Sequence, residues 1–242
     1  VLPMLTMQLS QAVYDIPAID FFAQSVVTNT TFIGAYRGAG RPEATQMVER
    51  VLDKAAAAIG MDPAEIRRKN YLQPDAFPLT TLVGANYDSG EYERSLDAVL
   101  EASGYSELRA EQTRRRETND PMLLGIGVSS YVEVTAPIGL HVEYGSCEIN
   151  DDGSATIKVG TSSHGQGHDT AFSMLVNDVL GIPMDQVNHV DADTETVARG
   201  SGTMGSRSLQ AGGSAVYEAS KVVLEKGKQL AATLLEASAD DI

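Results

Sequence analysis

The chain has 242 residues, 43% of them hydrophobic, and a net charge of −15. Its length suits one large domain or two small ones, its hydrophobic content excludes a disordered chain, and its negative charge argues against nucleic acid as a partner, because phosphate binding needs clustered lysine and arginine. The single cysteine, Cys147, excludes a disulfide framework and an iron–sulfur cluster held by this chain alone, and it indicates a reducing, cytoplasmic location.

In the first half of the chain, residues 1–33 are expected to be extended, with a β-branched run at their end. Apolar residues at helical spacing predict a helix over 43–59, which Gly60 ends. An Asp-Pro pair then predicts a short helix over 62–69, with the aspartate as N-cap and the proline in the first helical position. Prolines indicate an irregular segment over 70–89.

Two further helices are expected over 91–102 and 105–118, and the second is a charged connector. The first of them is expected to bury Tyr92, Leu96, Val99 and Leu100. The run Asn-Asp-Pro at 119–121 breaks the connector, and the sequence then becomes strand-like. We therefore expect a domain boundary there, with residues 1–120 and 121–242 in separate subdomains.

The second half of the chain is expected to begin with a strand over 122–134, and the run Asn-Asp-Asp-Gly at 150–153 predicts a hairpin. The hairpin strands and the elements after it are expected at 140–149, 155–159, 169–180 (helix), 187–190 (strand) and 209–237 (helix, with Val216, Ala219, Val223, Leu230 and Leu234 facing inward). This mixture of hairpins and helices favours an α+β fold over a doubly wound parallel sheet. No apolar run reaches the roughly 18 residues of a membrane span, so no transmembrane segment is expected.

Three glycine-rich loops, at residues 34–44, 160–170 and 200–208, each lead into an expected helix. Glycine lets the backbone approach a ligand closely, arginine offers forked donors, and a helix start presents free N–H groups to an anion. A plain turn accounts for any one such loop, but three in one chain indicate a site for a large polar or anionic cofactor. None of them matches a phosphate loop or the dinucleotide fingerprint, which disfavours a simple ATPase or NAD enzyme.

Taken together, the three loops resemble signatures of one enzyme family. The motifs are Thr28-Asn29-Thr30 followed by Ala35 to Ala44, then Gly165-Gln166-Gly167 with Thr170, and then Gly202 to Ser208. In this order and spacing they resemble the molybdenum-cofactor-binding large subunit of the xanthine oxidase, aldehyde oxidase and aerobic carbon monoxide dehydrogenase family. The resemblance covers essentially the whole chain, and it implies two partial molybdopterin-binding subdomains.

The resemblance implies oxidative hydroxylation at a molybdenum centre, with electrons leaving through iron–sulfur clusters to FAD. The cofactor would be molybdopterin, with its cytosine dinucleotide form as one alternative, and its dithiolene holds the metal, so no protein ligand to the metal is expected. The implied partners are an FAD-binding medium subunit, a 2Fe–2S small subunit, a second large subunit and a small-molecule substrate.

The resemblance also implies roles for individual residues. Those beside the metal would be Tyr36, Arg37 and Gly38; those binding the pterin or its phosphate tail would be Gly165, Gln166, Gly167 and Thr170; and those bonding the pterin rings would be Gly205, Ser206, Arg207 and Ser208.

The first loop narrows the substrate that the resemblance implies. Carbon monoxide dehydrogenases carry a copper-binding cysteine where this chain has Gly38, and purine-specific enzymes carry a stacking phenylalanine near the position of Ala39. Both departures argue against those substrates. An aldehyde or an N-heterocycle remains, with Ala39 and Tyr131 as expected pocket residues.

The family's general base is a glutamate in a Gly-x-Gly-Glu context, and no such motif occurs in this chain. The chain is therefore expected to be an internal fragment, inactive alone, of a longer subunit. Two alternatives stay open at this point. One is a truncated, non-catalytic module of the same fold, and the other is an unrelated phosphate- or nucleotide-binding protein.

Several other polar residues have ordinary interpretations that we favour. His164 and His168 have a spacing that suits zinc on a helix, but the glycines between them favour loop hydrogen bonds. Asp191 begins an acidic cluster that suits a solvated loop better than a cation site. Glu133 is expected to be ion-paired or exposed, and Cys147 to be a small buried residue.

Overall fold

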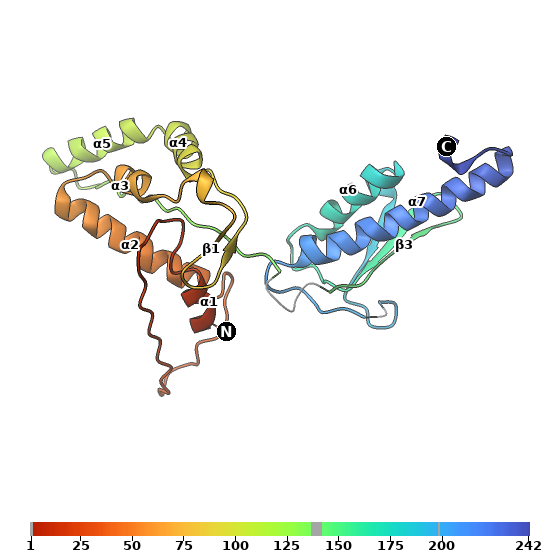
Figure 1. Cartoon of the computed structure of the whole chain (residues 1–242), viewed down its shortest axis with the longest axis horizontal. Coiled ribbons are helices and arrows are strands. Elements are labelled where there is room, and N and C mark those ends of the chain that lie inside the picture. Colours follow the sequence, from red (N-terminus) through yellow and green to blue (C-terminus); the bar gives the residue numbers. More distant parts are fainter. Residues whose placement is uncertain (1, 137–141, 198) are drawn as a thin grey trace. The chain divides into compact units, whose positions relative to one another are not determined.

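The computed structural model describes residues 2–136, 142–197 and 199–242. The chain divides into two compact units, Val1–Glu133 and Val134–Ile242, each with its own hydrophobic core (Figure 1). The boundary thus lies after residue 133 rather than at 120. Residues 121–133 belong to the first unit because hydrogen bonds hold them there, from Gln112 Nε2 to Leu124 O at 3.0 Å and from Ser130 N to Glu49 Oε2 at 3.2 Å. That each unit is a molybdopterin-binding subdomain stays a prediction.

The first unit is mostly helical. Its elements are α1 (Leu2–Gln8), α2 (Arg41–Ile59), α3 (Pro63–Asn70), η1 (Pro74–Ala76), β1 (Leu79–Thr80), β2 (Asn86–Tyr87), α4 (Tyr92–Ser103) and α5 (Tyr105–Glu117). The capping signals in the sequence work as expected. Asp62 Oδ1 accepts a hydrogen bond from Ala64 N at 2.8 Å, and Gly60 takes the left-handed conformation at the end of α2. Of the residues expected to be buried by α4, Leu96 is buried, whereas Val99 is 55% exposed.

The expectation of an extended segment over residues 1–33 is wrong at its start, because α1 is a helix there. This helix covers the start of α2, where a β-carbon on Gly40 would lie only 2.8 Å from Leu5 Cβ. The β-branched run at 26–33 is exposed and in no strand, and Val27 and Ile33 are almost fully accessible. A strand needs a partner for its backbone groups, and the described residues supply none to this run.

The first core surrounds a buried polar network. Tyr14 and Tyr71 stack with ring centroids 5.6 Å apart. Tyr14 OH donates to Glu49 Oε1 at 2.6 Å, and the fully buried Arg67 donates through Nε to Glu49 Oε2 at 2.7 Å. Arg67 also donates to Asp53 Oδ1 at 2.9 Å. This network connects α2 to α3 and to the segment that contains Tyr14.

The second unit has a three-stranded sheet. Its elements are β3 (Gly145–Ile149), β4 (Ala155–Val159), α6 (His168–Leu180), η2 (Met184–Gln186), β5 (Val187–Val190), η3 (Ser208–Gly213, a π-helical turn), α7 (Ser214–Leu235) and η4 (Ala239–Asp241). The strand order is β3-β4-β5, with β3 antiparallel and β5 parallel to β4. The predicted hairpin is confirmed, and so is the α+β class. The strand expected over 122–134 does not form.

Helices α6 and α7 lie along one face of this sheet (Figure 1), with α7 packed on β3 and α6 on β5. The alternating residues Ala155, Ile157 and Val159 of β4 are fully buried against them. Leu230 and Leu234, expected to face inward, are 62% and 74% exposed. The reason is length, because the 22 residues of α7 span about 33 Å while the five residues of β3 span about 17 Å.

Among the described residues, no helix is both long enough and apolar enough to span a membrane.

Candidate functional site

Two of the three glycine-rich loops lie at one edge of the sheet in the second unit. The parallel strands β4 and β5 end at Val159 and Val190, and the loops that follow them lead into α6 and into η3 with α7. The amino termini of both helices therefore lie at the carboxyl edge of the strands. Open α/β sheets bind ligands at this edge, and helix amino termini there favour an anion.

These two loops are joined to each other directly. Thr203 Oγ1 donates to Ser162 O at 2.6 Å, and Gly202 N donates to Gly160 O at 3.3 Å. A β-carbon on Gly160 would lie 2.4 Å from Gly200 Cα, so neither position has room for a side chain. The sequence predicted two similar loops, and the structure brings them together into one surface.

Arg207 is buried beneath these two loops and fixes the third loop to the segment before β3. Its side chain is fully buried, forms an ion pair with the equally buried Glu143, and donates to Gly202 O at 2.7 Å and to Val142 O at 2.5 Å. Arg207 was expected to bond the pterin rings. In the structure its guanidinium is buried and fixes the third loop, and its contact with the pterin rings stays a prediction.

Those neighbours are exposed or partly exposed. Ser206 has a φ of +55°, and Gly205 of +58°. Gly205 O accepts from Ala136 N at 2.9 Å, and Ser208 Oγ lies 3.5 Å from Thr203 Oγ1. Ser208 also begins the π-helical turn, a distortion that is frequent at functional sites. The third loop therefore keeps two hydroxyls available at a helix start.

In the second loop, Gln166 is exposed, and its side-chain oxygen accepts the backbone N–H of His164. Its amide NH2 makes no hydrogen bond to the described residues and is available to a ligand. Gly165 and Gly167 have φ values of +92° and +79°, with open space where a β-carbon would be. Thr170 is exposed in the first turn of α6. All four predicted residues thus lie on one accessible loop and helix start.

Buried polar atoms at this edge test whether a polar cofactor fits. Among the described residues, Thr161 Oγ1 and both ring nitrogens of His168 are buried without a hydrogen-bond partner. His189 Nδ1 pairs with Asp169 Oδ1 at 2.5 Å, and Asp191 accepts from Ser163 N at 2.7 Å. Unsatisfied buried polar atoms next to two helix amino termini suit an anionic, phosphate-bearing group, so the residues present fit the expected cofactor.

His168 has a buried environment that the sequence did not indicate. Its spacing to His164 suggested zinc or a loop hydrogen bond, yet the structure places His164 in the exposed loop and His168 as the buried first residue of α6. Its place directly after Gly165-Gln166-Gly167 was the available signal.

The first loop belongs to the other unit and is organised locally. Ala39 N donates to Tyr36 O at 2.7 Å, and Arg41 Nη1 donates to Gly38 O at 3.0 Å. A β-carbon on Gly38, which has a φ of +100°, would overlap the ring of Pro42. This compact turn leaves the Tyr36 and Arg37 side chains exposed. This loop belongs to the first unit, and the structure describes each unit by itself.

Glu133 contacts the end of the first loop, and Tyr131 lies two residues before it in the sequence. Glu133 pairs with Arg41 at 3.1 Å, as expected for an ion-paired glutamate, and Tyr131 is 64% exposed. Ala39, at φ +41°, is partly buried. The structure thus places Tyr131 and Ala39 in the same unit, and their contact with a substrate stays a prediction.

Cys147 is a half-buried residue of β3, and burial raises the pKa of its thiol. It lies in a strand of the second unit, whereas the copper ligand that the resemblance implies for carbon monoxide dehydrogenases would stand in the first loop, at the position of Gly38. Among the described residues, no cluster of three or more His, Cys, Asp or Glu side chains is arranged to hold a metal ion.

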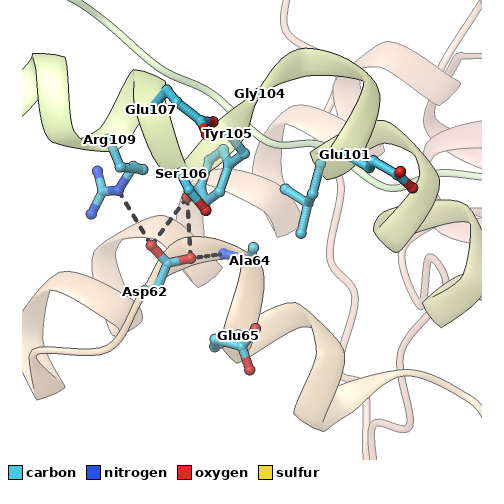
Figure 2. Close-up of a pocket in the computed structure, with 10 residues that line it drawn as sticks. Asp62, Ala64, Glu65, Glu101, Gly104, Tyr105, Ser106, Glu107 and Arg109 are labelled. Carbon is cyan, nitrogen blue, oxygen red and sulfur yellow. Dashed lines mark hydrogen bonds and ion pairs between the residues drawn. The ribbon is translucent and has the colours of Figure 1, made fainter.

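An open cavity of about 700 Å³ lies elsewhere, where α3 begins and α4 meets α5 (Figure 2). In it, Asp62 accepts from Tyr105 OH at 3.1 Å, and Arg109 Nε lies 3.3 Å from Asp62 Oδ2. Burial and the charge of Asp62 raise the pKa of Tyr105 to about 12. These groups pair with one another and cap α3, and no predicted site residue lines the cavity.

Comparison with known proteins decides between the interpretations left open by the sequence. Two family models described as molybdopterin cofactor-binding domains match residues 1–71 and 98–242, which together contain all three loops. The chain belongs to this molybdopterin cofactor-binding family. It is part of a molybdenum-binding large subunit of the xanthine oxidase family, as the resemblance implied.

Individual relatives agree with this assignment. The carbon monoxide dehydrogenase large chain of Hydrogenophaga pseudoflava is 38% identical over 95% of this chain and 30% of that protein. The nicotine 6-hydroxylase large subunit of Paenarthrobacter nicotinovorans is 36% identical over 95% of this chain and 29% of that protein. The crystal structure of quinoline 2-oxidoreductase from Pseudomonas putida 86 superposes with a TM-score of 0.88 at 32% identity, covering 99% of this chain and 31% of that one. This molybdopterin-binding chain therefore spans about 30% of the length of its relatives.

Proposed function

We propose that the large subunit to which this chain belongs binds a molybdopterin cofactor and hydroxylates an aldehyde or an N-heterocycle. The observation that carries the proposal is the joining of the second and third loops at the carboxyl edge of β4 and β5. There, two helix amino termini lie at one edge of the sheet, and buried polar atoms without hydrogen-bond partners lie beneath it. The matching family models support the same cofactor.

The second loop is proposed to hold the cofactor through Gln166, whose amide NH2 is available, and through the backbone of Gly165 and Gly167. Thr170 and the free N–H groups at the start of α6 suit the phosphate end. In the third loop, Ser206 and Ser208 offer hydroxyls, while the Glu143–Arg207 pair keeps that loop in place. These roles fit the exposed positions of the hydroxyls and amides.

The first loop is proposed to face the reacting end of the cofactor. Tyr36 and Arg37 are exposed and without partners among the described residues, so both can turn toward a ligand. When bound, the molybdenum cofactor supplies the oxidative hydroxylation chemistry. The loop's own contribution is to position the substrate and the cofactor and to limit the space beside Gly38.

The substrate class is proposed from the first loop and the relatives. A tight turn with Gly38 against Pro42 has no thiol to bind copper, and Ala39 has no ring to stack on a purine. The names of two similar proteins, nicotine 6-hydroxylase and quinoline 2-oxidoreductase, refer to N-heterocycles. We therefore place an N-heterocycle or an aldehyde ahead of carbon monoxide, although the carbon monoxide dehydrogenase large chain is similarly related.

The partners are proposed from the same family. An FAD-binding medium subunit and a 2Fe–2S small subunit would take the electrons, and a second large subunit would complete the assembly. The names of the relatives, such as "large subunit" and "complex subunit gamma", support a multi-subunit enzyme. We place this enzyme in the cytoplasm, where the lone thiol of Cys147 stays reduced.

The test is the cofactor content and the substrate range of the full-length large subunit, purified with its partner subunits. We expect close to one molybdenum and one pterin per large subunit, and reduction of the enzyme by quinoline, nicotine or aromatic aldehydes but not by carbon monoxide. Gln166→Ala should lower the pterin content several-fold, whereas Gln229→Ala, an exposed glutamine of α7, should not. Absence of pterin together with tight ATP or NAD binding would support the phosphate-binding alternative. Pterin without any hydroxylation would support a non-catalytic module.

A further inference from the structure

The histidine at the start of α6 is not explained by packing alone. His168 is 4% exposed, and neither of its ring nitrogens has a hydrogen-bond partner among the described residues. Its ring centroid lies 5.1 Å from that of Phe172 and 6.5 Å from that of His189. A buried polar atom without a partner destabilises a fold, and an apolar residue would fill the same space without that penalty.

The charge state of His168 follows from its surroundings. Burial lowers the pKa of His168, and His189 on β5 and His164 in the second loop lower it further. Asp191, after β5, and Asp169, in the first turn of α6, act in the opposite direction but do not overcome burial. His168 is therefore a neutral imidazole at pH 7.

The position of His168 links it to the proposed cofactor surface. It directly follows Gly167, the N-cap of α6, and lies two residues after Gln166. The first N–H groups of α6 have no helical partners, and the helix adds positive potential there. An anion bound at this point would favour the charged form of the nearby imidazole, as opposite charges do.

We propose that His168 is a positioning residue for a pyrophosphate group bound at the amino terminus of α6, and that it takes up one proton when this anion binds. The proton comes from solvent, so one proton and one anion bind together. The imidazolium then has two N–H donors at a place where the neutral ring has none satisfied. The inference rests on the proposed function and names the phosphate-bearing end of the cofactor as the group that this loop recognises.

The proposal has a definite pH dependence. The proton is absent from the free protein at pH 7 and present in the complex, so the affinity for pyrophosphate increases as pH falls. The affinity for pyrophosphate rises as pH falls from the pKa of His168 in the complex to the lowered pKa of His168 in the free protein. The limiting slope for one linked proton is about tenfold in affinity per pH unit.

The test is calorimetric titration of inorganic pyrophosphate into the cofactor-free large subunit, at about pH 6.5, in two buffers of different protonation enthalpy. Pyrophosphate changes its own protonation, so the decisive quantity is the difference between wild type and His168→Gln. We expect wild type to take up more protons than His168→Gln by an amount approaching one per site. The exposed neighbour provides the control, because His164→Gln should retain the uptake of wild type.

A second measurement does not depend on a variant that folds. In wild-type protein with ¹⁵N-labelled histidine, the His168 ring signals should move from the neutral to the imidazolium pattern on addition of pyrophosphate. Equal proton uptake in wild type and His168→Gln, loss of the uptake in His164→Gln, or no binding of pyrophosphate would overturn the inference. Pterin content distinguishes the two claims. If the enzyme carries pterin but shows no proton uptake linked to His168, the inference about His168 is rejected and the proposed function stands. If the subunit never carries pterin but binds pyrophosphate with linked proton uptake, the proposed function is rejected and the inference about His168 stands.

Discussion

Glu143 and Arg207 form an ion pair in which both side chains have no exposed surface. Arg207 also donates to the carbonyls of Gly202 and Val142, so the pair connects the third loop to the segment before β3. The guanidinium lies beneath the proposed cofactor surface rather than on it. This relationship gives the first prediction.

Glu143→Gln keeps the shape of the side chain but leaves a buried positive charge without its counterion. We expect the free energy of unfolding to fall by about 3–5 kcal/mol, the usual effect of breaking a buried pair. Urea denaturation followed by circular dichroism measures it. Lys221→Ala serves as the control, because its pair with Glu218 is exposed and its loss should change stability by less than about 0.5 kcal/mol. Equal effects of the two variants would contradict a buried pair.

The contact between Gly160 and Gly200 gives the second prediction. An alanine at 200 would place its β-carbon 2.5 Å from Gly160 Cα, so the two loops must separate. We expect Gly200→Ala to lower stability by about 1–3 kcal/mol and to reduce the pterin content of the enzyme. Gly227→Ala, in the middle of α7 with open space around it, should instead stabilise by up to about 1 kcal/mol. Unchanged pterin content in Gly200→Ala would show that the loop contact is not needed for binding.

Tyr14 gives a prediction at alkaline pH. Burial raises its pKa well above the ordinary value, and its hydrogen bond to Glu49 raises it further. A group with a raised pKa in the folded state contributes stability below the unfolded pKa, and this contribution is lost as pH rises toward the folded value. We therefore expect stability to fall above about pH 10, the ordinary tyrosine value.

The corresponding variant is Tyr14→Phe. At pH 7 it should lower stability by about 1–3 kcal/mol, because Glu49 loses a buried donor, and it should lose less stability between pH 9 and 11 than wild type, a window about pH 10. Tyr217→Phe, on the surface of α7, should follow wild type at both pH values. An alkaline profile that is identical in Tyr14→Phe and wild type would contradict this assignment.

Cys147 gives a prediction about reactivity. Burial raises the pKa of its thiol, although the hydroxyl of Ser220 lowers it slightly, and the side chain is only half accessible in β3. Since only the thiolate reacts, we expect alkylation by iodoacetamide at pH 8 to be at least about tenfold slower in native than in unfolded protein. The native rate should keep rising beyond the ordinary cysteine pKa. Fast alkylation at pH 7 would instead indicate an activated thiol.

The local signals in the sequence predicted much of the fold. The Asp-Pro pair at 62–63, the glycine after α2 and the turn at 150–153 all act through neighbouring residues, and each is confirmed. The run at 26–33 has strand composition but finds no pairing partner among the described residues, and pairing is not a local property. Helical periodicity likewise could not show that α7 extends beyond the end of the sheet, because the length of the sheet is not a local property of the α7 sequence.

In the candidate site, too, some features were predictable from the sequence and others were not. Glycine-rich loops before helices are visible in the sequence, but only the structure shows that the second and third are joined. The role of Arg207 was not predictable, because its partner Glu143 is far away in sequence and its burial depends on packing. The sequence could not show that the ring nitrogens of His168 lack hydrogen-bond partners, because this depends on side chains from β5 and the neighbouring loops.

The packing of α1 against Gly40, at the start of α2, has a consequence for local unfolding. This helix has only seven residues, and helices shorter than about 12 residues are marginal unless something holds them. Its opening would release the start of α2 and the first loop while the cores around Tyr14 and Ile157 stay folded. Amide hydrogen exchange should therefore be fast at Leu5, Thr6 and Gly40 and slow in the second unit's sheet. The first loop would then unfold at a lower free energy than the second and third loops, so the part of the chain proposed to face the reacting end of the cofactor opens before the part proposed to hold it.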